Sequence, residues 1–189
     1  HMNFRRGGRF ACSECGTEDL PVHDTVEKTW RHLNFFQYKC YIHLRTPRTK
    51  CPKCGDRLWL PPWGRKQSGF TMLFEAFVMA LAKEMPISKI GELVEEQDTR
   101  IWRIVRGYVN RSYAKKCFSD VEKIGTDETS SRKGHNYVTV FADMESGEVL
   151  FATEGKDSAT IKAFSEELPK HEAKPEQIQE VTMDMSPAF

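Results

Sequence analysis

The chain has 189 residues, 39% of them hydrophobic, which suits one medium-sized globular domain or two or three small ones. Its longest apolar stretch, residues 70–85, contains Glu75 and Lys83 and is too short to cross a bilayer, so composition argues against a membrane-spanning helix. We interpret His1 and Met2 as a cloning remnant with no signal peptide after them, and expect a soluble cytoplasmic protein with reduced cysteines.

Charge is distributed unevenly behind a net value of +1. Residues 1–120 hold 21 Lys and Arg against 13 Asp and Glu, whereas residues 121–189 hold 7 against 14. A basic first part suits the phosphate backbone of nucleic acid. The acidic second part cannot bind DNA by bulk charge, and most of its carboxylates are expected to form solvated surface.

The first segment, residues 3–66, combines short predicted strands with paired cysteines. Residues 26–33 and 39–44 are expected to be strands. The four paired cysteines, each pair followed by a glycine, are Cys12, Cys15, Cys51 and Cys54. Thiolates three positions apart can reach one tetrahedral Zn²⁺, and the glycine permits the tight turn, so the pattern predicts a structural zinc site in a zinc ribbon. Iron or a disulfide are the alternatives.

Cys40 and His43 offer a rival ligand pair between the two cysteine knuckles. We expect Cys40 to be a buried small residue and His43 a surface residue, because four thiolates already complete a zinc site. Cys117 has no partner in the sequence and is expected to be inert.

The second segment, residues 67–119, is helical by its apolar period and predicts a helix-turn-helix. Pro86 ends the first helix and is expected in the first turn of the second. The apolar faces expected to be buried are Leu73, Phe74, Phe77, Val78 and Leu81, then Ile87, Ile90, Leu93 and Val94, then Ile101, Trp102, Ile104, Val105 and Tyr108. The short connection, residues 95–98, lacks the usual glycine, and paired helices also occur in domains that bind no DNA.

The third predicted helix carries the side chains expected to contact double-stranded DNA. Thr99, Arg100 and Arg103 are expected near base edges. Side chains expected near phosphates are Arg106, Arg111, Lys115 and Lys116.

The third segment, residues 120–189, returns to strand-type residues. The predicted order is strand 121–128, strand 137–144, strand 148–153, helix 157–168 and strand 180–185, that is, β-β-β-α-β. Asp127 and Asp184 fall at the ends of the first and fourth strands. If these strands are neighbours, both carboxylates emerge at one edge and can share a divalent metal, although turn chemistry also places aspartate there.

Together these pieces resemble bacterial insertion-sequence transposases that carry an N-terminal zinc ribbon, a helix-turn-helix and a DDE catalytic domain of RNase-H-like fold. The resemblance is carried by residues 29–33, 45–55, 69–71, 127–130, 133–135, 153–157 and 183–188. It implies an α+β multi-domain protein whose last part begins an RNase-H-like domain. It also implies that Asp127 and Asp184 are catalytic ligands of Mg²⁺ or Mn²⁺ for cutting and joining DNA strands.

The resemblance further implies a third acid beyond the second aspartate, and no residue of this sequence matches it. Glu128, on the opposite face of a strand from Asp127, is a poor substitute. We therefore expect a chain that binds DNA, associated with the nucleoid, without cutting it. Its open sheet edge favours a homodimer. The alternatives are a truncated repressor or competitor of complete transposases, and a zinc-ribbon interaction protein with no role on DNA.

Overall fold

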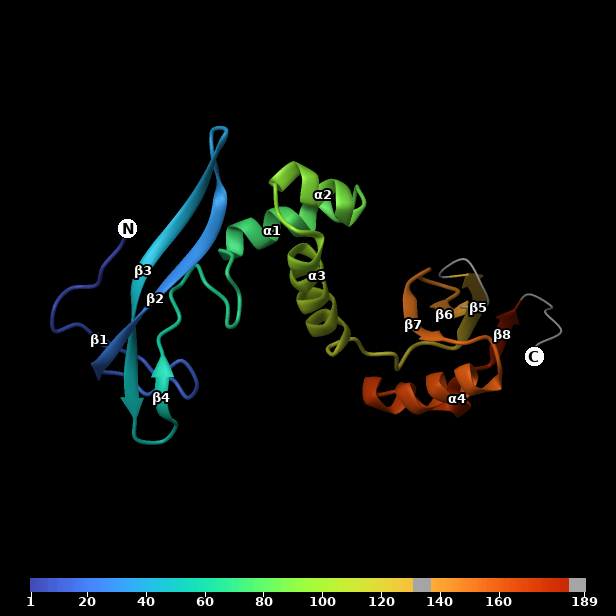
Figure 1. Ribbon diagram of the computed structural model, residues 1–189. Helices are drawn as coiled ribbons and strands as arrows, with labels where there is room; N and C mark the ends of the chain where they lie inside the picture. The colour runs from blue at the N-terminus through green and yellow to red at the C-terminus, as the bar shows by residue number, and fades with distance from the viewer. Residues whose placement is uncertain (131–136, 184–189) are drawn as a thin grey trace. The chain divides into compact units, whose positions relative to one another are not determined.

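The computed structural model describes residues 1–130 and 137–183 (Figure 1). The chain divides into two compact units, His1–Tyr108 and Val109–Phe189. Within the described ranges, no helix has the length and apolar character needed to span a membrane.

A long β-hairpin dominates the sheet of the first unit. The strands are β1 (Arg9–Phe10), β2 (Leu20–Phe35), β3 (Tyr38–Cys51) and β4 (Gly55–Leu58), antiparallel in the order β1-β2-β3-β4. Both expected strands of this segment are confirmed, but β2 and β3 are much longer than predicted. Backbone pairing from Val22 opposite Thr49 to Phe35 opposite Tyr38 extends them through residues that carry no local strand signal, with register shifts near both ends of the pairing.

Three helices follow the sheet: α1 (Met72–Leu81), α2 (Ile87–Val94) and α3 (Asp98–Tyr113). The first unit includes α1, α2 and α3 as far as Tyr108, and the last residues of α3 belong to the second unit. Thr71 caps α1 by accepting a hydrogen bond from the backbone N–H of Phe74. Pro86 stands at the N-cap of α2, one position before the first turn where the sequence placed it. The buried core of these helices consists of Phe70, Phe74, Val78, Ile90, Val94, Ile101 and Ile104.

The apolar faces of the helices are narrower than the sequence period suggested. Leu73, Phe77, Leu93 and Trp102, all expected in the core, are exposed. The neighbouring elements cover only one stripe of each helix, so apolar residues beside the stripe reach solvent.

The connection between α2 and α3 makes its sharp turn without a glycine at the turn itself. Glu95, the C-cap of α2, adopts the left-handed conformation with φ of 54°. A glycine is needed one turn earlier, at Gly91, where a Cβ would stand 2.9 Å from the backbone oxygen of Glu96. The turn therefore folds back closely over Gly91.

The second unit is a four-stranded sheet with one long helix against it. Its elements are β5 (Lys123–Ser130), β6 (Tyr137–Asp143), β7 (Val149–Glu154), α4 (Ser158–Glu167), the 3₁₀ helices η1 (Leu168–His171) and η2 (Pro175–Gln177), and β8 (Glu180–Met183). The strand order is β7-β6-β5-β8, with β8 parallel to β5 and the other pairs antiparallel. The predicted β-β-β-α-β order is confirmed, with the two 3₁₀ helices added before β8.

The core of the second unit lies between the sheet and α4. Its buried residues are Phe118, Val121, Ile124, Phe141, Leu150, Phe164, Leu168 and Ala173. Phe141 and Phe164 stack with ring centroids 4.5 Å apart, which fixes α4 over the centre of the sheet.

Candidate metal centre and nucleic-acid interface

The four knuckle cysteines come together at the base of the hairpin. Their sulfur atoms all lie within 4.8 Å of one another, and the Sγ atoms of Cys15 and Cys51 are 3.6 Å apart. Sulfurs that surround a zinc ion tetrahedrally at about 2.3 Å lie about 3.8 Å from each other. The cluster therefore has the size of a Cys₄ zinc site, and no other metal-sized group of ligands occurs among the described residues.

Each cysteine pair is held by a tight turn that its glycine closes. Gly16 and Gly55 have φ of 71° and 75°, as expected from the sequence. The backbone N–H of Glu14 points at the sulfur of Cys12 at 3.5 Å, and Cys51 pairs with Gly55 across β3 and β4. Amide hydrogens aimed at sulfur favour the thiolate, which is the form that binds metal.

The electrostatics of the cluster favour a bound cation. The side-chain and backbone hydrogen bonds of Thr17 lower the pKa of the Cys15 thiol to about 6. Proton donation to Cys15, followed by burial, raises the pKa of Cys54 to about 12. Thiolates this close repel one another, so a divalent cation is what allows all four to ionise together.

Cys40 and His43 stay outside the cluster. Nδ1 of His43 forms a hydrogen bond with the hydroxyl of Thr29 at 2.8 Å. Cys40, expected to be buried, and His43, expected at the surface, are both half-buried on β3. Cys40 lies opposite His32 in the hairpin. Among the described residues, the ligand cluster contains the four knuckle cysteines and neither Cys40 nor His43.

The outer face of α3 carries the predicted DNA-contacting side chains. Thr99, Arg103 and Arg106 are exposed, and Arg106 lies over the ring of Trp102 at 5.7 Å. Arg100 differs, because its guanidinium pairs with Glu96 and lies 4.4 Å from the ring centroid of Phe70. The structure thus leaves Arg103 and Arg106 on the open surface, while Arg100 is held by its own domain. Arg111 and Lys115, in the second unit, are also exposed.

The ribbon and the helices of the first unit are joined through a buried arginine of β2. The side chain of Arg31 is 1% exposed and donates to the backbone oxygen of His32 and to Oδ1 of Asn34. It also lies 3.8 Å from Glu96 and over the ring of Phe74. Arg31 therefore links the hairpin to α1 and to the turn before α3.

A second junction surrounds Glu75 on α1. This carboxylate is fully buried, accepts two hydrogen bonds from Arg65 and one from Tyr108, and accepts another from Ser68 at 2.5 Å. Arg65 and Ser68 belong to the segment that follows the ribbon. Their anchoring to Glu75 fixes the backbone of residues 65–69 against the helices.

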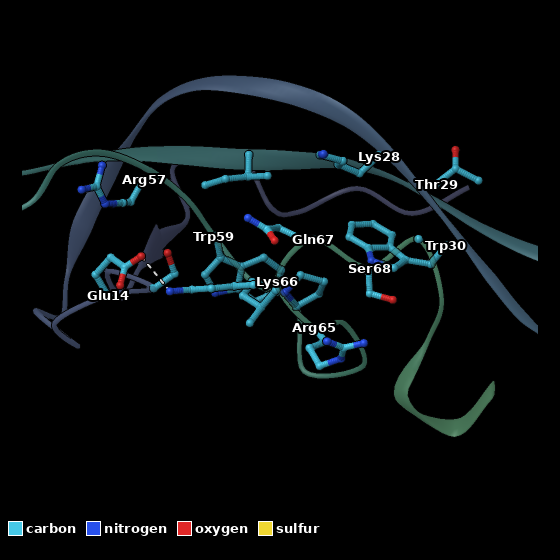
Figure 2. Close-up of a pocket in the computed structure, with 15 residues that line it drawn as sticks. Glu14, Lys28, Thr29, Trp30, Arg57, Trp59, Arg65, Lys66, Gln67 and Ser68 are labelled. Atoms are coloured by element: carbon cyan, nitrogen blue, oxygen red, sulfur yellow. Dashed lines mark hydrogen bonds and ion pairs between the residues drawn. The ribbon is translucent and has the colours of Figure 1, made fainter. Parts of the chain in front are cut away.

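A groove of about 500 Å³ opens between the ribbon and residues 65–69, which we call the ribbon groove. Figure 2 shows Lys28 and Thr29 on β2 along one side and Trp59 and Lys66 along the other, with Gln67 between them. Lys66 pairs with Glu14 at 2.7 Å. Sequence analysis did not find this groove, because its walls come from four separate stretches of chain.

In the second unit, Asp127 lies exposed on β5, opposite Val140 of β6. The strand begins at Lys123 and continues to Ser130, so Asp127 lies within the strand rather than at its end. Its Oδ1 accepts the backbone N–H of Glu128 at 2.8 Å. Glu128 is half-buried. Asp184 lies outside the described residues, and β8 ends at Met183 beside Thr126.

Three family models match successive parts of the chain. A zinc-finger model of transposases IS204, IS1001, IS1096 and IS1165 matches residues 8–54, and the helix-turn-helix domain of transposase family ISL3 matches residues 60–109. A transposase model of the same family matches residues 124–189. The chain belongs to the ISL3 family of transposases.

Curated relatives agree with the ISL3 assignment. A transposase for insertion sequence element IS1557 of Mycobacterium tuberculosis is 32% identical over 146 residues, covering 75% of this chain and 32% of the relative. A transposase for element IS1001 of Bordetella parapertussis is 29% identical over 180 residues, covering 94% of this chain and 44% of the relative. The chain thus spans 32% and 44% of the length of these two relatives.

The structure adds to the ISL3 assignment a surface that sequence reasoning missed. Phe35, Phe36 and Tyr38 at the tip of the β2–β3 hairpin are 69%, 81% and 67% exposed. The only signal in the sequence was the density of aromatic residues between positions 35 and 41. Phe35 and Phe36 contact each other there, with ring centroids 4.8 Å apart.

Proposed function

We propose that the first unit binds the DNA ends of an insertion sequence, as part of a transposase. The observation that carries this proposal is the helix-turn-helix, whose second helix α3 presents Thr99, Arg103 and Arg106 on its open face while Ile101 and Ile104 are buried beneath it. Such a helix enters the major groove with its first turns near the base edges. Arg103 is the side chain best placed to read a guanine, and Arg106 to contact a phosphate. Arg111 and Lys115, which belong to the second unit, are proposed as further phosphate contacts.

The zinc site has a structural role in this proposal. Four thiolates close the coordination sphere, so the ion has no open position for water or substrate. Its contribution is to hold β1, β3 and the two knuckle turns together, since the core beside the cysteines contains little more than Leu20.

The catalytic centre of the complete enzyme is proposed to use Asp127 and Asp184. The support is that β5 and β8 are adjacent parallel strands whose register places Met183 beside Thr126, the residue before Asp127. An exposed carboxylate at this edge has the oxygen ligands that Mg²⁺ or Mn²⁺ prefers. Such ions would supply Lewis-acid stabilisation for phosphoryl transfer, in a domain that we propose to be RNase-H-like.

A homodimer is also proposed, through the outer edge of the second unit. Among the described residues β8 is the last strand of the sheet order, with Val181 and Met183 exposed, and an edge strand of this kind can pair with another chain. Light scattering across protein concentrations tests this association, and a strict monomer at high concentration contradicts it.

The DNA-binding proposal is tested by selecting a binding site from random duplex DNA and then comparing Arg103→Ala with the parent chain. We expect the parent to bind its selected site in a salt-dependent manner. Arg103→Ala should cost about 1–3 kcal/mol on that site and relax preference at one base position. Equal loss on selected and random DNA would show that α3 does not read sequence. Arg106→Ala is the matched control and should weaken both DNAs alike.

A further inference from the structure

We propose that the ribbon groove binds an unpaired nucleotide of a DNA strand, its base on Trp59 and its phosphates on Lys28 and Arg57. This inference rests on the proposed DNA-binding function and adds a second kind of contact to it. The duplex is held by α3, and the groove takes a single-stranded part of the same DNA.

The floor of the groove is apolar and aromatic. Trp59, Leu60 and Pro61 line it, and the half-buried Trp59 leans on Phe10 with ring centroids 5.1 Å apart. A surface that only follows the phosphates of a duplex has no use for such a floor. A base freed from its partner has a flat π-face that stacks on an aromatic side chain regardless of sequence.

The rim of the groove is cationic. Lys28 and Arg57 form no ion pair with any described carboxylate, and Nε of Arg57 is buried without a hydrogen-bond partner. The one acidic side chain of the lining, Glu14, is already paired with Lys66. Arg57 also donates Nη1 to the backbone oxygen of Asp56 at 2.8 Å, so the charge of Lys28 and the Nε–H of Arg57 are what the rim offers to a ligand. A phosphodiester is an anion whose oxygens accept hydrogen bonds from such donors.

Gln67 projects between the two walls (Figure 2). Its backbone has φ of 58°, a conformation that residues with side chains seldom adopt, and its amide makes no hydrogen bond to a described residue. The turn keeps this conformation because Arg65 and Ser68, on either side, are anchored to the buried Glu75. An unfavourable backbone conformation that is maintained by its surroundings is typical of functional sites. The side-chain amide of Gln67 can form hydrogen bonds with the edge of a base.

The size of the groove fits the same occupant. About 500 Å³ is within the range of pockets that enclose small organic ligands, and a single nucleotide belongs to that class. All walls of the groove belong to the first unit, so no rearrangement between units is needed to form it.

The experiment compares two probes on the full chain loaded with zinc: the selected duplex with blunt ends, and the same duplex carrying a short single-stranded thymine extension. The parent chain should bind the extended probe more tightly than the blunt one. Trp59→Leu should reduce this preference by about 5- to 150-fold, the range expected for one lost stack, while Trp59→Phe should retain most of it.

Charge and amide variants separate the remaining contacts. Lys28→Gln should lower the slope of log affinity against log salt by about 0.7 on the extended probe and leave the blunt probe unchanged. Gln67→Gly, which relieves the backbone, should lower the preference without unfolding the ribbon. Lys83→Gln, at an exposed lysine after α1 that lies outside the groove and outside the zinc knuckles, is the matched control and should change neither probe. Zinc content and melting temperature verify that each variant is folded.

The outcomes distinguish this inference from the DNA-binding proposal. If the parent binds the blunt duplex through Arg103 but shows no preference for the extension, the groove proposal is wrong and the function stands. If it binds only the extension, the groove proposal holds and the helix-turn-helix proposal is wrong. Equal weakening of both probes by Trp59→Leu would overturn the groove as a single-strand site.

Discussion

Arg65 donates two hydrogen bonds to Glu75, from Nε to one carboxylate oxygen and from Nη2 to the other, each at 3.0 Å. Glu75 is fully buried on α1, and Arg65 lies in the segment that leaves the ribbon. Tyr108 of α3 donates to the same carboxylate at 2.9 Å. One acidic side chain therefore connects the ribbon exit with two helices of the helix-turn-helix.

Glu75→Gln should destabilise the first unit by about 3 kcal/mol, because it leaves the Arg65 guanidinium without its charge partner in a largely buried position. Urea denaturation followed by circular dichroism measures this change. Glu92→Gln, which breaks an exposed pair with Lys89 on α2, is the control and should change stability by less than about 1 kcal/mol. Similar small effects of both variants would show that the buried pair contributes little.

Stability should fall in acid in a way that depends on Glu75. Burial raises the pKa of this carboxyl, but hydrogen bonds from Arg65, Ser68 and Tyr108 lower it further, so the net pKa lies below its usual value. A lowered folded-state pKa stabilises the fold fully above the unfolded value of about 4.3 and progressively less as pH falls through the folded value. The contribution of Glu75 to the free energy of unfolding should therefore be constant from neutral pH to about pH 5 and then decrease. The decrease should be shallower in Glu75→Gln, and parallel pH profiles would contradict this.

Zinc removal should unfold the ribbon. The cluster beside Cys12, Cys51 and Leu20 is too small a core to fold without metal, so a strong chelator should abolish the near-ultraviolet dichroism of the ribbon tryptophans. Metal analysis should give about one zinc per chain.

Single cysteine variants test the ligand set. Cys54→Ser should lose zinc, whereas Cys40→Ser should retain it, because Cys40 lies outside the cluster. Retention of zinc by Cys54→Ser together with its loss in Cys40→Ser would reverse the ligand assignment.

Gly91→Ala should destabilise the helix-turn-helix although it lies in a helix, where alanine normally gains about 1 kcal/mol over glycine. The new Cβ would stand 2.5 Å from Oδ1 of Asp98 and 2.9 Å from the backbone oxygen of Glu96. The side chain can rotate away, but the backbone of the turn must shift, at a cost of about 1–3 kcal/mol. Thermal melting measures this loss of stability. Ser88→Ala, exposed on the same helix, should be neutral or mildly stabilising, and a stabilised Gly91→Ala would refute the close approach.

Residues that act through local spacing were predictable. The cysteine pairs with their glycines, the three helices and the β-β-β-α-β order all depend on periods of a few residues, which the chain displays directly. The sequence left open whether the first and fourth strands are neighbours. The structure pairs β5 with β8, and it places Asp127 within β5 rather than at its end. The lengths of β2 and β3 were underestimated because pairing between strands, rather than propensity, carries them to the hairpin tip.

The sequence alone therefore determined the four cysteines that cluster, the types of element and the family. Only the tertiary structure decided that Glu75 and Arg31 are buried junctions, that Arg100 is held by Glu96 and Phe70, and that a basic, aromatic groove opens beside Gln67. Each of these includes groups that lie far apart in the sequence, such as Arg31 with Glu96, Tyr108 with Glu75, and Arg100 with Phe70. Charged side chains usually lie in solvent, and only the three-dimensional packing shows which of them the fold has enclosed.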